Sequence, residues 1–108
     1  IPDTESIAAA RADSAAAGAF ARIENHYFSN GGWMEDGQLI RDAADKLAGI
    51  PGVIVQGRYD ACTPARTAWD LHRAWPEAHF EMIADAGHAA SEPGIVDALI
   101  RATDRFAA

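Results

Sequence analysis

Two short apolar runs, each followed by a loop and a helical segment, constrain the fold of this chain more than any other feature. Residues 53–55 (Val-Ile-Val) and 80–83 (Phe-Glu-Met-Ile) have the length and composition of buried strands. The order strand, helix, strand, helix predicts parallel strands joined by a right-handed crossover. Such strands are buried on both faces, and two of them do not complete a sheet of this kind. The sequence therefore predicts one portion of a larger α/β domain.

Two helices are predicted ahead of the first strand. A stretch rich in alanine over residues 4–28 predicts a helix, in which Gly18 is a weak point or a break. The run Asn30-Gly31-Gly32 predicts the end of this helical region. A second helix is expected over about residues 37–47, where leucine, isoleucine and alanine recur at helical spacing.

Two further helices are predicted, one after each strand. Thr63-Pro64 predicts a helix start, with the threonine as the cap and the proline in the first turn. Pro76 predicts that this helix ends at about Trp75. The last helix is expected to open near residues 91–93, and its predicted inward stripe consists of Val96, Leu99, Thr103 and Phe106.

Composition excludes several classes of partner. The 108 residues carry a formal net charge of −7, which argues against nucleic acid or an anionic membrane, since both require a basic surface. No apolar stretch approaches the length that crosses a membrane. The single cysteine, Cys62, excludes an internal disulfide and is typical of a reducing compartment, so a cytoplasmic location is predicted. Because the chain begins with Ile1-Pro2-Asp3, we expect it to be a segment of a longer protein.

Asp60 and His88 are the residues whose positions indicate chemistry. Each follows one of the two predicted strands, and the carboxyl ends of parallel strands are where ligand sites lie in open α/β sheets. An aspartate followed by a histidine in this order matches the second and third members of a Ser-Asp-His triad on such a sheet. Gly87 permits a tight turn that aims the imidazole.

The nucleophile of such a triad is missing from the sequence. Four serines are present, and none lies in a G-x-S-x-G elbow: Ser6, Ser14, Ser29 and Ser91. Cys62 also lacks the elbow and is expected to be a buried small hydrophobe. No His/Cys/Asp/Glu spacing resembles a zinc site and no glycine-rich phosphate cradle occurs, so neither a metal nor a cofactor is predicted.

Six collinear segments of the sequence carry a resemblance to a known family: Ala21–Phe28, Ile50–Asp60, Ala68–Leu71, Trp75–Ala78, Ala86–His88 and Ala102–Phe106. Together they closely resemble the carboxy-terminal part of the proline iminopeptidase (prolyl aminopeptidase) family. The resemblance covers about residues 19–107.

The resemblance implies a fold, an activity and three site residues. The fold would be the C-terminal portion of an α/β-hydrolase sheet, with a helical cap-domain remnant over residues 1–35 and the hydrolase core over residues 36–108. The activity would be that of a serine exopeptidase that releases amino-terminal proline from peptides. Asp60 and His88 match the catalytic acid and base, and Glu24 matches a cap-domain glutamate that binds the free α-amino group. An exopeptidase must require a free amino terminus in its substrate. A partly desolvated carboxylate meets this need, because it binds the substrate's ammonium group strongly.

The departures from the family pattern concern the parts that come earlier in such enzymes. The nucleophile elbow, the oxyanion-hole glycines and a second amine-binding glutamate are absent, and Trp33 stands where phenylalanine is expected. The isolated chain is therefore expected to be inactive, because an acid and a base have nothing to activate without a nucleophile. The missing N-terminal half of the hydrolase is its expected partner.

Two alternatives remain at the level of the sequence. Another α/β hydrolase, such as an esterase or an epoxide hydrolase, would use the same aspartate and histidine but would have no purpose for Glu24. A non-catalytic remnant or interaction domain would instead complete its sheet with a partner chain, since unpaired strand edges favour association.

Overall fold

The computed structural model describes residues 4–5, 9 and 14–107, and they fall into two compact units. Residues up to Gln38 form one unit, and the chain from Leu39 onward forms the other. Each unit is described by itself. Within these described ranges, no helix combines the length and the apolar character that crossing a bilayer requires.

The first unit contains a long helix and a short helical turn. Helix α2 spans Ser14–Ser29, and the 3₁₀ turn η1 spans Gly31–Trp33. The helix continues through Gly18, so the predicted break there is wrong: a glycine in a helix interior costs only about 1 kcal/mol. The predicted stop is confirmed, because Gly31 has a φ of +55°, a conformation that glycine adopts at little cost. The predicted helical residues 6–8 and 10–13 lie outside the described part.

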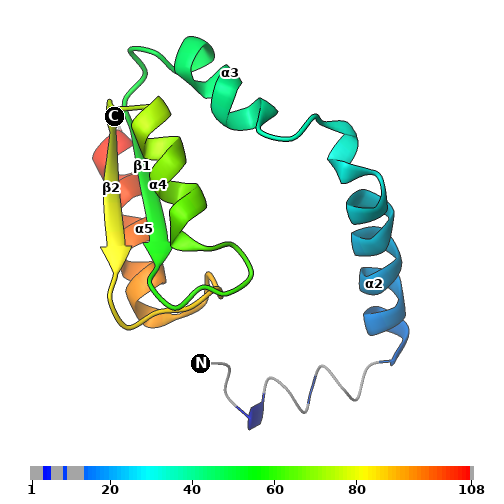
Figure 1. Ribbon diagram of the computed structural model, residues 1–108. Helices are drawn as coiled ribbons and strands as arrows, with labels where there is room; N and C mark the ends of the chain where they lie inside the picture. The colour runs from blue at the N-terminus through cyan, green and yellow to red at the C-terminus, as the bar shows by residue number, and fades with distance from the viewer. Residues whose placement is uncertain (1–3, 6–8, 10–13, 108) are drawn as a thin grey trace. The chain divides into compact units, whose positions relative to one another are not determined.

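The second unit is an α/β structure (Figure 1). Its elements are α3 (Gln38–Lys46, whose first residue precedes the unit boundary), β1 (Gly52–Gly57), α4 (Ala65–Ala74), β2 (Ala78–Ile83) and α5 (Pro93–Phe106). The two strands pair in parallel, with Gly52 opposite Ala78 and Gly57 opposite Ile83. The prediction of two parallel strands with flanking helices is therefore confirmed, and in the described residues the sheet consists of these two strands.

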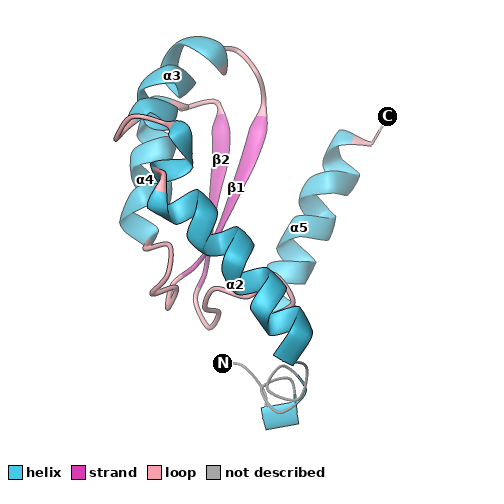
Figure 2. Ribbon diagram, turned by 90° about the vertical axis from the view of Figure 1, so that its right-hand side faces the viewer, coloured by secondary structure: helices cyan, strands magenta, loops and turns pink. Residues whose placement is uncertain are grey.

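Helices α4 and α5 cover opposite faces of the strand pair (Figure 2). Successive side chains of a strand point to its two faces in turn, so neighbouring residues of β2 contact different helices. The ring of Phe80 packs edge-on against Trp69 of α4, with 5.7 Å between the ring centroids. The next residue, Glu81, instead forms an ion pair with Arg101 of α5 at 2.6 Å.

Helix α5 uses a different face from the one that the sequence predicted. Ile95 and Ala98 are its buried residues, at 7% and 0% exposure. The predicted inward residues are exposed instead, namely Val96, Leu99, Thr103 and Phe106. Because the Ala98 side chain is small, the helix backbone can approach the strands closely on the face that carries Ile95 and Ala98. The wider apolar stripe is left facing away from the two strands.

The loops that follow β1 and β2 are joined by backbone hydrogen bonds. The Arg58 amide donates to the Ile83 carbonyl at 3.0 Å, and the Tyr59 amide donates to the Ala86 carbonyl at 2.9 Å. This approach depends on Gly57, because a Cβ there would overlap the carbonyl oxygen of Gly87. Backbone atoms cannot move aside as the end of a flexible side chain can, so the position requires glycine.

Substitution of Gly57 tests how far the second unit depends on this approach. Gly57→Ala should lower the free energy of unfolding by about 2 kcal/mol or more, as expected for overpacking against rigid backbone. Urea titration followed by circular dichroism measures the change. The matched control is Gly18→Ala, where nothing lies within 4 Å of the added Cβ. That change should raise the helix content slightly, and equal tolerance of both substitutions would contradict the steric argument.

Candidate active site

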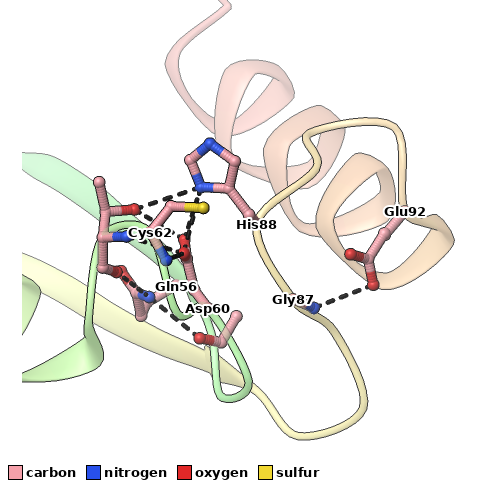
Figure 3. Close-up of polar contacts among 8 residues, drawn as sticks. Gln56, Asp60, Cys62, Gly87, His88 and Glu92 are labelled. Atoms are coloured by element: carbon pink, nitrogen blue, oxygen red, sulfur yellow. Dashed lines mark hydrogen bonds and ion pairs between the residues drawn. The ribbon is translucent and has the colours of Figure 1, made fainter. Parts of the chain in front are cut away.

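The structure brings Asp60 and His88 together (Figure 3). Asp60 lies three residues beyond the end of β1, and His88 lies in the loop between β2 and α5. The Nδ1 atom of His88 lies 3.0 Å from Oδ2 of Asp60 and 3.1 Å from Oδ1. The side chain of Asp60 is 7% exposed, whereas that of His88 is 58% exposed. A buried carboxylate therefore supports an imidazole whose outer edge is open.

Hydrogen bonds from its own loop hold the Asp60 carboxylate in place. Oδ1 accepts from the backbone amides of Cys62 at 3.0 Å and Thr63 at 2.9 Å, and Oδ2 accepts from the Thr63 hydroxyl at 2.7 Å. Burial by itself would raise the pKa of Asp60, but the hydrogen bonds from Thr63, His88 and Cys62 outweigh it and hold the pKa well below its usual range. The carboxylate is thus ionised and fixed in orientation.

Thr63 has a different role from the predicted one. Helix α4 begins at Ala65, its cap position is Pro64, and no side chain caps it. The Thr63 hydroxyl binds Asp60 instead and also lies 3.4 Å from Nδ1 of His88. An aspartate that accepts hydrogen bonds from the residues two and three positions later is a familiar turn, so the run Asp60–Thr63 carried a signal for this contact.

A buried amide supports the same loop from below. Gln56 is 8% exposed, and its Nε2 donates to the carbonyls of Gly57 and Thr63, both at 3.0 Å. The end of β1 is thereby tied to the far side of the turn that carries Asp60. A satisfied polar side chain in a buried position restricts a loop to one conformation.

The loop that carries His88 is anchored by Glu92. One carboxylate oxygen of Glu92 accepts a hydrogen bond from the Gly87 amide at 2.9 Å. This bond is the main reason that the pKa of Glu92 lies below its usual range. The contact fixes the residue that immediately precedes His88. The sequence marked Glu92 only as part of a helix start, and its distance of five residues from Gly87 matches no standard capping pattern.

Cys62 is exposed, so the prediction of a buried cysteine is wrong. The reason is local: its backbone amide points inward to Asp60, and its side chain is left at the surface. The fold also brings together a group of potential metal ligands that the sequence spacing did not indicate. Ligand atoms of Asp60, Cys62 and His88 all lie within 4.8 Å of one another.

Glu24, the third predicted site residue, lies in the other compact unit. It is in the middle of α2 and is exposed. The helix buries none of its residues within its own unit. Glu24 is therefore accessible there, and its role stays a prediction.

Parallel strands with a helix on each face, followed by an acid and a histidine in successive loops, place this chain in the α/β class as the C-terminal portion of an α/β-hydrolase fold. No protein-family model matches the chain. Curated relatives do match. This chain is 61% identical over 90 residues to the proline iminopeptidase of Xanthomonas citri, and the matched region covers 82% of this chain and 28% of the relative.

Two further organisms supply relatives of the same name. The proline iminopeptidase of Arabidopsis thaliana is 52% identical over 90 residues (83% of this chain, 24% of the relative). That of Neisseria gonorrhoeae is 49% identical over 92 residues (85% of this chain, 29% of the relative). The chain belongs to the proline iminopeptidase family, and it spans about a quarter of the length of the curated relatives it matches.

The hydrogen bonds on Asp60 predict a pH dependence of stability. Its pKa is lower in the folded chain than the value of about 3.9 expected when unfolded. The stabilisation is therefore present above that value and is lost as the pH falls below it toward the folded pKa. In urea titrations, Asp60→Asn should be less stable than the unmodified chain at pH 7, and the difference should shrink at pH 3.

Thr63 offers a matched pair for the same measurement. Thr63→Val removes the hydroxyl that donates to Asp60 and should reduce the loss of stability between pH 7 and pH 3. Thr63→Ser retains a hydroxyl and should keep most of that loss. If the valine and serine variants show the same pH dependence, the hydroxyl does not hold the carboxylate in its ionised form.

Proposed function

We propose that this chain is the C-terminal segment of a serine exopeptidase that releases amino-terminal proline from peptides. The observation that carries the proposal is the hydrogen-bonded pair of Asp60 and His88 in a chain up to 61% identical to proteins named proline iminopeptidase. In this proposal residues 1–35 are a remnant of the cap domain and residues 36–108 belong to the hydrolase core. The names of the relatives favour this class over an esterase, an epoxide hydrolase or a non-catalytic interaction domain.

Asp60 and His88 act in this proposal as the acid and the base of a triad. The carboxylate accepts a hydrogen bond from Nδ1–H and thereby holds the ring proton on Nδ1, which leaves the lone pair of Nε2 available. Nε2 takes the proton of a serine hydroxyl from another segment of the protein as the serine oxygen attacks the prolyl carbonyl. The imidazolium then gives this proton to the departing amine, and an acyl-enzyme forms. Water cleaves the ester by the same two proton transfers and releases proline.

Glu24 provides the specificity for a free amino terminus in this proposal. The cyclic amine of an amino-terminal proline is protonated and carries two N–H donors, which a carboxylate accepts as charge-assisted hydrogen bonds. A substrate with an acylated proline lacks both the charge and these donors. The position of Glu24 on an exposed part of α2 and the family resemblance support this role.

The expected partner is the N-terminal segment of the hydrolase, which would supply the serine and the oxyanion hole. The described sheet has two strands. Each strand is paired with the other along one edge, and within the described residues its second edge is not paired with a strand. Exposed apolar side chains on α5, among them Leu99 and Ile100, are available for further packing. The relatives are three to four times longer than the matched region, so their remaining sequence has room for such a segment.

The mechanism needs no metal or cofactor, and the single cysteine favours a cytoplasmic location.

A chimera tests the catalytic roles. In the Xanthomonas citri relative, the 90 matched residues would be replaced by those of this chain, and release of the arylamine from a proline arylamide would be measured. The chimera should be active and the 108-residue chain alone inactive. Asp60→Ala and His88→Ala should each lower kcat by about 10³-fold or more. His79→Ala, an exposed histidine on β2, is the matched control and should retain turnover. An active His88→Ala chimera would overturn the assignment.

The role of Glu24 predicts a selective effect on substrate binding. In the chimera, Glu24→Gln should raise KM for a proline arylamide with a free amine by about tenfold, which corresponds to the loss of about 1.4 kcal/mol of charge-assisted binding. The change in kcat should be smaller. Glu35→Gln is the matched control and should leave KM unchanged. An equal KM for the Glu24→Gln variant and the unmodified chimera would exclude an amine-binding role.

A further inference from the structure

The surface next to the Asp60–His88 pair carries a third side chain that the proposed peptidase reaction does not use. This is the thiol of Cys62, which is exposed and lies beside the His88 ring (Figure 3). Oxygen, nitrogen and sulfur atoms from Asp60, Cys62 and His88 are within 4.8 Å of one another. Three different donor types thus lie close together, a buried carboxylate beside an exposed thiol and an exposed imidazole.

The separation of these donors is close to what a tetrahedral zinc ion requires. Zinc binds carboxylate oxygen and imidazole nitrogen at about 2.0–2.2 Å and thiolate sulfur at about 2.3 Å, so adjacent ligand atoms lie about 3.3–3.8 Å apart. His88 Nδ1 and the Asp60 carboxylate are already 3.0 Å apart. All three ligand atoms lie within 4.8 Å of one another, and the Cys62 side chain is exposed and not enclosed by packing. Mg²⁺ and Ca²⁺ prefer oxygen ligands and do not suit this set.

Two features of the loop prepare the group for a cation. The hydrogen bond from the Cys62 amide to Asp60 fixes the cysteine backbone beside the carboxylate. The Thr63 amide and hydroxyl hold the carboxylate independently of His88, so Asp60 keeps its orientation when the proton on Nδ1 is replaced. Oriented ligands of this kind raise metal affinity.

From this geometry we propose that Asp60, Cys62 and His88 form a binding site for a thiophilic divalent cation such as Zn²⁺, and that the bound ion switches off the Asp60–His88 pair. The second part rests on the proposed peptidase function. Binding converts the thiol to a thiolate and releases its proton to solvent. The metal takes the lone pair of Nδ1, so the imidazole proton resides on Nε2. A protonated Nε2 cannot accept the proton of a serine, and catalysis stops.

The binding part is tested on the 108-residue chain without any measure of activity. Cd²⁺, a spectroscopic substitute for Zn²⁺, is titrated into the reduced chain, and the ultraviolet charge-transfer absorption of a cadmium–thiolate bond is recorded. One equivalent should bind and Zn²⁺ should displace it. Cys62→Ser should abolish the absorption, and His88→Ala should weaken the affinity at least tenfold. His79→Ala is the matched control and should bind normally. Absence of saturable binding, or equal affinity in the His88→Ala variant, would overturn the site.

The inhibitory part is tested on the chimera described above. Zn²⁺ should abolish release of the arylamine from the proline arylamide, and a chelator should restore it. In a Cys62→Ser chimera, compared with its own zinc-free rate, the concentration that halves turnover should rise at least tenfold. Unchanged sensitivity would overturn inhibition through this site. An inactive chimera would count against the peptidase proposal alone, because the cadmium titration of the chain is independent of it.

Discussion

The arrangement of the site depends on the backbone contact between the two loops that follow the parallel strands. The strands end in register, and the bonds from Arg58 and Tyr59 extend the connection beyond the last paired residues. Without this link each loop would be an independent surface segment, and two side chains from segments that move separately could not keep a hydrogen-bond distance. The absence of a side chain at Gly57 therefore sets the geometry of residues that it never touches.

Each member of the pair also has its own support, and the two supports differ in kind. Asp60 is held by donors from within its own turn and by the buried Gln56 below it. His88 is held through its neighbour in the chain, because the bond from the Gly87 amide goes to Glu92 at the start of α5. This division leaves the carboxylate rigid and buried and the imidazole open on one edge. The proposed role of His88 needs that open edge, because a base must exchange protons with a substrate and a nucleophile.

Sequence reasoning found the architecture and the pair because both are encoded by strong local signals. The apolar runs and the glycine and proline punctuation predicted the strands, and the position after each strand predicted Asp60 and His88. It failed where the outcome depends on tertiary choice. Two apolar stripes compete on α5, and packing selected the one with Ala98. The Thr63 hydroxyl had two possible partners, the backbone N–H groups at the start of α4 and the Asp60 carboxylate, and it donates to the carboxylate. The exposure of Cys62 follows from the direction of a turn, which spacing does not reveal.

The position of Glu92 at the start of α5 has a consequence for the whole C-terminal helix. Glu92 occupies the N-cap position of the helix, and its side chain accepts the hydrogen bond from Gly87 in the loop of His88. The helix in turn is seated on the strands through Ile95 and Ala98. The residue before His88 is thus tied to the start of α5 through one carboxylate. The packing of the last helix therefore bears on where the His88 loop lies as well as on the stability of the fold.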